Sequence, residues 1–157
     1  MDLDAALRQL DAHYQAMPPV AAMQLSIAAY DGLRLRLFAP LPVHVNDKGC
    51  AFGGSLGSLM TLAAWGLVTL RVQEAGMQAD VFVADSRIRY LAPLFTDLQA
   101  EAELDAAASW DAFVATLRER GRARTELVAR VPLPNGGIAA EFAARYVAFR
   151  KDQHAAR

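Results

Sequence analysis

The sequence of 157 residues contains little cysteine, little histidine and almost no net charge. Its single cysteine, Cys50, excludes an internal disulfide and agrees with a reducing compartment. The three histidines, His13, His44 and His154, are far apart and do not form the ligand spacing of a zinc site. The formal net charge of −1 gives no sign of a nucleic acid or an acidic membrane as partner. We therefore expect a cytoplasmic protein that has no metal site and does not bind nucleic acid.

We also expect no secretory leader, because residues 1–4 are acidic where a signal peptide is basic. Residues 50–70 carry no charge, and that length is close to the roughly 20 residues that cross a bilayer. Glycine and serine fill the first half of this stretch, which leaves residues 56–70 as its apolar helical part. That part is too short to span comfortably, so we expect a buried central helix and no membrane insertion.

Hydrophobic residues make up 54% of the chain, which is enough for one domain (residues 1–157) with its own core. Helical spacing of leucines predicts an N-terminal helix over residues 2–16, ended by Pro18-Pro19. Two short strands should follow, joined by a hairpin at Asp31-Gly32 in which both turn residues take positive φ. In the second strand, Leu33, Leu35 and Leu37 alternate with other residues, so one face should be buried.

A long helix over residues 54–75 is apolar on nearly every face, with Gly76 as its C-terminal cap, and must be surrounded by other elements. Four strands should follow it, over residues 79–91, 97–106, 122–132 and 138–150. Ser109 should cap a short helix over residues 109–119, and the tail from Lys151 should be loose. An antiparallel sheet wrapped around one central helix is the simplest way to cover that helix. The sequence thus predicts an α+β protein with a hotdog fold.

The region around the start of the long helix is the most informative part of the chain. A polar loop at residues 46–49 leads through Phe52 to Gly53-Gly54, where the helix opens. A helix start has unpaired N–H groups and a partial positive charge. Glycine there lets a substrate oxygen approach the backbone closely, which can polarise a carbonyl without a metal or cofactor. The alternative explanation is tight packing at the helix start.

With these residues identified, the chain resembles the hotdog thioesterases, and among them most closely the YiiD C-terminal-type thioesterase domain. The resemblance covers roughly residues 40–148 and is most specific between Asn46 and Gly66. The matching residues are Asn46, Gly49, Phe52-Gly53-Gly54-Ser55-Leu56, Trp65-Gly66, Ala84-Asp85-Ser86, Ile88-Arg89-Tyr90, Pro93, Gly121-Arg122, Glu141-Phe142 and Tyr146-Val147.

The resemblance implies a homodimer, with further assembly into a dimer of dimers open, and acyl-thioester sites at the subunit interface. Asn46 matches the family's Asn before the Gly-Gly pair. Phe52 stands where such enzymes often have a His, and Thr61 stands where the catalytic Asp or Glu is expected. The usual carboxylate is therefore absent from its usual place. Asp85, on the following strand, is the replacement that we expect to activate water, although it could instead form an ion pair with Arg87 or Arg89.

The remaining candidate residues have both a functional and a structural interpretation. Gly54 would hold the oxyanion, Asn46 would orient water or the acyl carbonyl, and Thr61 would hold the water. Substrate contacts are expected from Gly53, Phe52, Ser55, Arg89 and Arg122. Structurally, Asn46 would bond its own loop, and the helical hydroxyls would bond the preceding turn.

Two further groups of residues carry weaker hypotheses. Cys50 could be a nucleophile with His44 six residues earlier, but spacing cannot show spatial pairing. Arg118, Arg120, Arg122 and Arg124 would share one side of a strand that started early, and could meet the phosphates of coenzyme A or a carrier arm. The structural alternative is a solvated turn.

The sequence and the resemblance together predict hydrolysis of an acyl thioester of coenzyme A or acyl carrier protein. No cofactor is expected apart from the coenzyme A or phosphopantetheine of the substrate itself. One alternative is a non-catalytic acyl-CoA or acyl-carrier binding module, which the missing helix carboxylate favours. A hotdog dehydratase or hydratase would need a His with a carboxylate, and a structural dimerisation module would bind no ligand.

Overall fold

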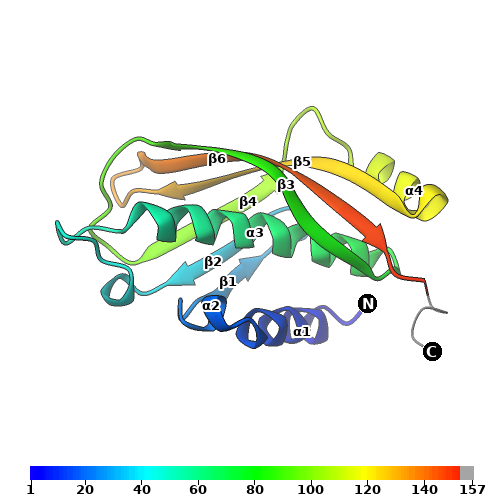
Figure 1. The fold of residues 1–157 in the computed structure, drawn as a ribbon, viewed down its shortest axis with the longest axis horizontal. Helices are drawn as coiled ribbons and strands as arrows, with labels where there is room; N and C mark the ends of the chain where they lie inside the picture. The colour runs from blue at the N-terminus through cyan, green and yellow to red at the C-terminus, as the bar shows by residue number, and fades with distance from the viewer. Residues whose placement is uncertain (153–157) are drawn as a thin grey trace.

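One antiparallel sheet of six strands curves around a long helix, α3, in a computed structural model that describes residues 1–152 (Figure 1). The elements in chain order are α1 (Leu3–Ala16), α2 (Pro18–Ala21), β1 (Ser26–Tyr30), β2 (Leu35–Ala39), the 3-10 helix η1 (Leu41–Val43), α3 (Gly53–Glu74), β3 (Ala79–Tyr90), β4 (Leu98–Leu104), α4 (Trp110–Arg120), β5 (Arg122–Pro132) and β6 (Ile138–Arg150). The loose tail predicted for residues 151–157 lies outside the described residues, apart from Lys151 and Asp152.

The strand order across the sheet is β1-β2-β4-β5-β6-β3, and every pair of neighbours is antiparallel. The strand after α3 therefore crosses to the far edge of the sheet, where it pairs with β6 over almost its whole length. Figure 1 shows α3 running between β1 and β2 on one side and β3, β5 and β6 on the other. The predicted hotdog fold, with an antiparallel sheet wrapped around a central helix, is confirmed.

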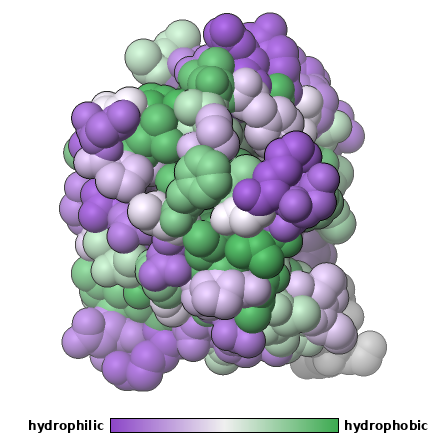
Figure 2. Space-filling view, turned by 90° about the vertical axis from the view of Figure 1, so that its left-hand side faces the viewer, coloured by the Kyte–Doolittle hydropathy of each residue, from purple (hydrophilic) through white to green (hydrophobic). Residues whose placement is uncertain are grey.

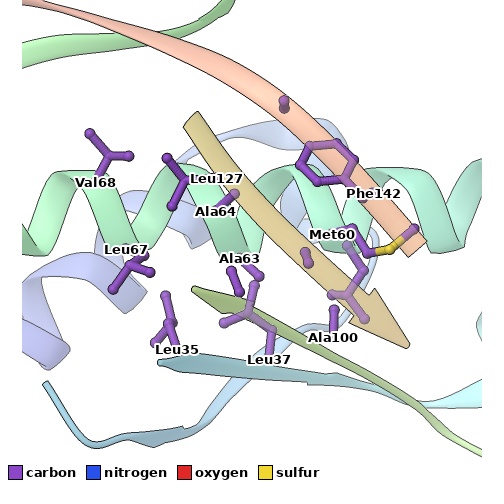
Figure 3. Close-up of a cluster of buried hydrophobic side chains, with 14 of the residues drawn as sticks. Leu35, Leu37, Met60, Ala63, Ala64, Leu67, Val68, Ala100, Leu127 and Phe142 are labelled. Carbon is purple, nitrogen blue, oxygen red and sulfur yellow. The ribbon is translucent and has the colours of Figure 1, made fainter. Parts of the chain in front are cut away.

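The core lies between α3 and the inner face of the sheet. α3 residues such as Met60 and Leu67 are fully buried and pack among strand residues such as Leu37 and Phe142 (Figure 3). α3 is the one helix among residues 1–152 that is long and apolar enough to cross a membrane, but 61% of its most apolar window is buried inside this domain. Its hydrophobicity is therefore explained by its central position.

Several local signals have the predicted effect. α3 ends in a Schellman motif: the N–H of Gly76 donates to the carbonyl of Gln73, and the N–H of Met77 donates to the carbonyl of Val72. Gly76 takes the positive φ (77°) that this motif requires. Ser109 Oγ accepts the N–H of Ala112 at 3.2 Å and so caps α4 as expected.

Two local predictions, both at the first hairpin, were wrong. In the hairpin at Asp31-Gly32, only Gly32 takes positive φ, because the Asp31 carboxylate accepts the N–H groups of Leu33 and Arg34 and forms a wider turn. Leu33 lies in that turn and is 66% exposed, whereas Leu35 and Leu37 are buried. The proline pair ends α1 as predicted, and it also begins α2.

The arginines around Gly121 do not share one side of a strand. Arg118 and Arg120 lie in the last turn of α4, and β5 begins only at Arg122. Gly121, at a φ of 74°, separates the two elements. The Arg118 guanidinium donates to the carbonyl of Ala75, so it holds the end of α3. Positive side chains in a last helical turn also stabilise that end of the helix.

Candidate functional site

A short hairpin over residues 44–52 leads into α3. The N–H of Phe52 donates to the carbonyl of His44 at 2.7 Å, and the N–H of Asn46 donates to the carbonyl of Cys50 at 2.8 Å. Gly49 takes a φ of 80° at the tip. The hairpin brings His44 beside the first turn of α3, although residues 45–52 separate it from the helix in the sequence.

The first turn of α3 carries free hydrogen-bond donors. Phe52 is the N-cap residue, and no side chain caps the helix. The N–H groups of Ser55 and Leu56 both donate to the carbonyl of Phe52. For the N–H groups of Gly53 and Gly54, no acceptor is found among residues 1–152. Two donors and the positive end of the helix dipole are thus available to an oxygen placed there.

An open groove of about 680 Å³ lies beside this helix start. It is lined by Pro19, Val20, Met23, Phe52, Gly54, Ser55, Gly57, Ser58, Thr61, Leu62, Ile88 and Tyr90. Most of these side chains are apolar, and the lining includes no carboxylate and no imidazole. Figure 2 shows the end of the molecule at which α3 begins, where hydrophobic residues reach the surface between hydrophilic ones. The groove has the chemistry to hold an acyl chain next to the free N–H groups.

β3 forms one wall of the groove. The Tyr90 hydroxyl donates to the carbonyl of Gly53 at 3.1 Å, and a Cβ on Gly57 would lie only 2.9 Å from Ile88 Cδ1. Sequence reasoning did not assign Ile88 and Tyr90 to the site. Strand alternation places both residues on the face opposite Arg87 and Arg89, but it does not say which face points toward α3.

Gly54 lies close to the ring of Phe52. A Cβ at this position would lie 2.6 Å from the ring of Phe52, which folds over the glycine. Phe52 is itself 56% exposed. An exposed ring can move aside, so packing against Phe52 does not by itself require glycine at position 54.

Asn46 and Cys50 contact each other within the hairpin. Asn46 Oδ1 accepts the N–H groups of Lys48 and Cys50 at 2.8 and 3.2 Å, and its Nδ2 lies 3.2 Å from Cys50 Sγ. The structural interpretation of Asn46, that it bonds its own loop, is therefore present. His44 does not pair with Cys50, so the structure does not form the Cys–His arrangement.

His44 is instead a buried partner of Ser55. The imidazole is 5% exposed, with Nδ1 2.8 Å from Ser55 Oγ and Nε2 2.8 Å from the carbonyl oxygen of Met23. A carbonyl oxygen can only accept, so in the neutral ring Nε2 carries the hydrogen and Nδ1 accepts the Ser55 hydroxyl hydrogen. No signal in the sequence pairs these two residues.

Thr61 lines the groove one turn beyond Gly57. Its hydroxyl donates to the carbonyl of Gly57 at 2.8 Å, which is the common arrangement for a helical threonine. Among residues 1–152, no three His, Cys, Asp or Glu side chains lie close enough together to hold a metal ion.

Five predicted site residues are not among those that line the groove: Asn46, Gly53, Asp85, Arg89 and Arg122. Asn46 lies in the hairpin before α3, and Gly53 lines a neighbouring hollow together with Tyr90. Asp85 is on the outer face of the sheet, 3.7 Å from the guanidinium of Arg145, which itself bonds Glu126 at 3.1 Å. Arg89 lies on the same face and pairs with Glu141 at 3.0 Å. Arg122 is exposed at the start of β5. The ion-pair interpretation of Asp85 is thus present, with Arg145 in place of Arg87 or Arg89.

Replacing Asp85 by Asn tests its predicted role as general base. If Asp85 activates water across a subunit interface, thiol release should fall by about a hundredfold or more. Because its side chain faces away from the groove, we expect a change below about threefold and a stability loss below about 1 kcal/mol. Steady-state thiol release and urea unfolding measure the two effects. A hundredfold loss with an unchanged unfolding midpoint would restore Asp85 to the catalytic machinery.

The model of the family described as "Putative thioesterase (yiiD_Cterm)" matches residues 7–150. The chain belongs to this family. A protein with unknown function from Chlorobaculum tepidum is similar in structure, with a TM-score of 0.88, 28% identity, and coverage of 94% of this chain and 96% of that one. A "putative thioesterase" from Shewanella oneidensis has a TM-score of 0.83, 27% identity, and coverage of 94% and 99%.

A more distant structure confirms the fold alone. A thioesterase from Haemophilus influenzae is 13% identical to this chain, with a TM-score of 0.73 and coverage of 94% of both chains. The hotdog thioesterase resemblance inferred from the sequence is therefore confirmed at the level of family and fold.

Proposed function

We propose that this protein hydrolyses an acyl thioester of coenzyme A or of acyl carrier protein. The observation that carries the proposal is the apolar groove lined by Gly54, at the helix start where the N–H groups of Gly53 and Gly54 have no acceptor among the described residues. Membership of a thioesterase family agrees with this chemistry.

In the proposed complex, the thioester carbonyl oxygen points at the N–H groups of Gly53 and Gly54. One oxyanion donor typically contributes about 3–4 kcal/mol of barrier lowering in acyl transfer. The acyl chain lies along α3 over Gly57 and Thr61, against Ile88 of β3. Coenzyme A or phosphopantetheine enters as part of the substrate, and no other cofactor takes part.

The proposed assembly is a homodimer in the cytoplasm. β3 is the last strand of the sheet, so one side of its backbone has no strand partner among the described residues. It also exposes Phe82 and Val83, which are 55% and 42% accessible. An unpaired apolar edge is a ready surface for pairing with a second copy. Pairing along β3 would place two grooves close to the interface. Two such dimers could associate through other faces to form a dimer of dimers.

A non-catalytic acyl-binding module is the second candidate. It is favoured by one specific observation: the groove lining includes no carboxylate and no imidazole to activate water. A dehydratase or hydratase fits less well, because His44 is bonded to Ser55 and to a backbone carbonyl instead of a carboxylate.

Thiol release from a panel of acyl-CoA and acyl-carrier thioesters of graded chain length tests the function. We expect turnover by the wild type, and we expect Gly57→Val to lower kcat/KM for long chains by about tenfold or more, because added carbons would fill the groove floor. Short chains should be affected much less.

Ala115→Val is the matched control, since it adds a β-branched side chain at an exposed position of α4 away from the groove. It should leave the chain-length profile unchanged. Binding of acyl-CoA by the wild type without thiol release would support the binding module, and absence of both would point to a structural dimerisation module.

A further inference from the structure

His44 is a buried polar side chain whose two ring nitrogens are both hydrogen-bonded. Its ring is 5% exposed, and its two nitrogens have two different partners. The Met23 carbonyl holds the hydrogen on Nε2, which leaves the Nδ1 lone pair aimed at the Ser55 hydroxyl. A base oriented by a third group and bonded to a hydroxyl is the arrangement that activates a serine nucleophile.

Ser55 is also positioned for attack on a bound ligand. It lines the groove and is the third residue of α3. Helical side chains lean toward the N-terminus of their helix, so its Oγ lies over the turn that carries the free N–H groups of Gly53 and Gly54. A thioester carbonyl bonded to those groups would place its carbon next to Oγ.

We propose that Ser55 is a nucleophile activated by His44, and that hydrolysis proceeds through an acyl ester on Ser55. This inference rests on the proposed function and names the groups that carry it out. It also removes the difficulty that the groove itself holds no base, because His44 lies directly behind the serine.

The reaction has two balanced steps. Ser55 Oγ attacks the thioester carbonyl carbon while its proton passes to His44 Nδ1, the C–S bond breaks, and the thiolate takes the proton and leaves as the thiol. Water then attacks the acyl-Ser55 ester, gives its proton to Nδ1, and the ester C–O bond breaks as Ser55 regains the proton. The products are the carboxylic acid and the thiol, and water is the only other reactant. In both steps the oxyanion is held by the N–H groups of Gly53 and Gly54.

The competing explanation is that the hydrogen bond only ties the 44–52 hairpin to α3. The two explanations differ for His44→Asn, since an Asn side chain keeps an acceptor near the Nδ1 position but is not a base. A tie would tolerate this change, whereas an activated nucleophile would lose its reactivity.

An alkyl fluorophosphonate reports the nucleophile without any thioester. We expect the wild type to gain one phosphonyl adduct, located on Ser55 by peptide mass spectrometry. Ser55→Ala should gain none, and His44→Asn should react at least about tenfold more slowly. Ser26→Ala, at an exposed serine of β1 outside the groove, should react like the wild type. Ser55→Cys keeps a nucleophile beside His44 and should be alkylated by iodoacetamide at residue 55. This second variant tests the site even if the alanine variant does not fold.

The outcomes separate the inference from the function on which it rests. Thiol release by a wild type that forms no Ser55 adduct would overturn the nucleophile and leave the thioesterase standing with direct attack by water. A His44-dependent adduct without thiol release would support the pair and overturn the thioester substrate. Labelling that is unchanged in His44→Asn would overturn the assigned base.

Discussion

Ser55→Ala is expected to lower kcat for thioester hydrolysis by at least about a thousandfold, since removing a serine nucleophile takes away the covalent route. The residual rate would come from water attack on a carbonyl still polarised by Gly53 and Gly54. Because the groove and those N–H groups remain, KM should change much less than kcat. Steady-state thiol release on the best substrate of the panel measures both constants.

The same variant removes the Ser55 hydroxyl that donates to the buried Nδ1 of His44. This loss lowers the free energy of unfolding by about 1–3 kcal/mol unless water replaces the hydroxyl. Thermal unfolding of the variant therefore belongs beside its kinetics. The Ser26→Ala control should keep wild-type kinetics. Retention of kcat within about tenfold by a folded Ser55→Ala variant would contradict a nucleophilic role.

Gly66→Ala is expected to destabilise the protein by about 2 kcal/mol, although alanine is about 1 kcal/mol better than glycine inside a helix. A Cβ at Gly66 would overlap the Tyr14 hydroxyl and lie 2.8 Å from Leu35 Cδ2. Tyr14 is fully buried, and its hydroxyl donates to the carbonyl of Leu62 at 2.7 Å, so it cannot move aside without losing that bond. The direction of the change is decided by packing of α1 on α3. Urea unfolding at one protein concentration measures it.

Tyr14→Phe provides the matched test of the mechanism. It removes the oxygen that the new methyl group would meet, so the double variant should be less destabilised than the sum of the two single variants. Additive effects would show that the overlap with the hydroxyl is not the cause. A Gly66→Ala variant as stable as the wild type would contradict close packing of α1 against α3 altogether.

The long regular elements could be predicted from the sequence because their local patterns agree with their environments. The predicted ranges 122–132 and 138–150 coincide with β5 and β6, and the predicted range 54–75 differs from α3 by one residue at each end. In these segments, apolar alternation or an all-apolar helix leaves one arrangement that buries the side chains. The two strands of the first hairpin were predicted over residues 23–30 and 33–39, which is longer than β1 and β2, since their ends depend on tertiary contacts and on the turn between them.

The candidate site was predicted in part. Phe52, Gly53 and Gly54 lie at the helix start that we inferred, because a glycine pair before an apolar helix is a local signal. Asp85 was predicted either to activate water or to form an ion pair, with its direction left open, and the structure puts it on the outer face with Arg145. Strand alternation defines two faces but does not say which of them faces α3. The pairing of β3 with β6 decides that.

The sequence by itself determined the fold, the family and the position of the glycine pair at the start of α3, because each could be inferred from local patterns and short motifs along the chain. Only the tertiary structure decided which side chains meet there. His44 reaches Ser55 because a hairpin of backbone hydrogen bonds folds residues 44–52 onto α3. Met23, which precedes α3 in the chain, and Tyr90, which follows it, line the same groove. Hydrogen bonds between distant residues form only when packing of the whole chain supplies the geometry, so residue spacing could not reveal them.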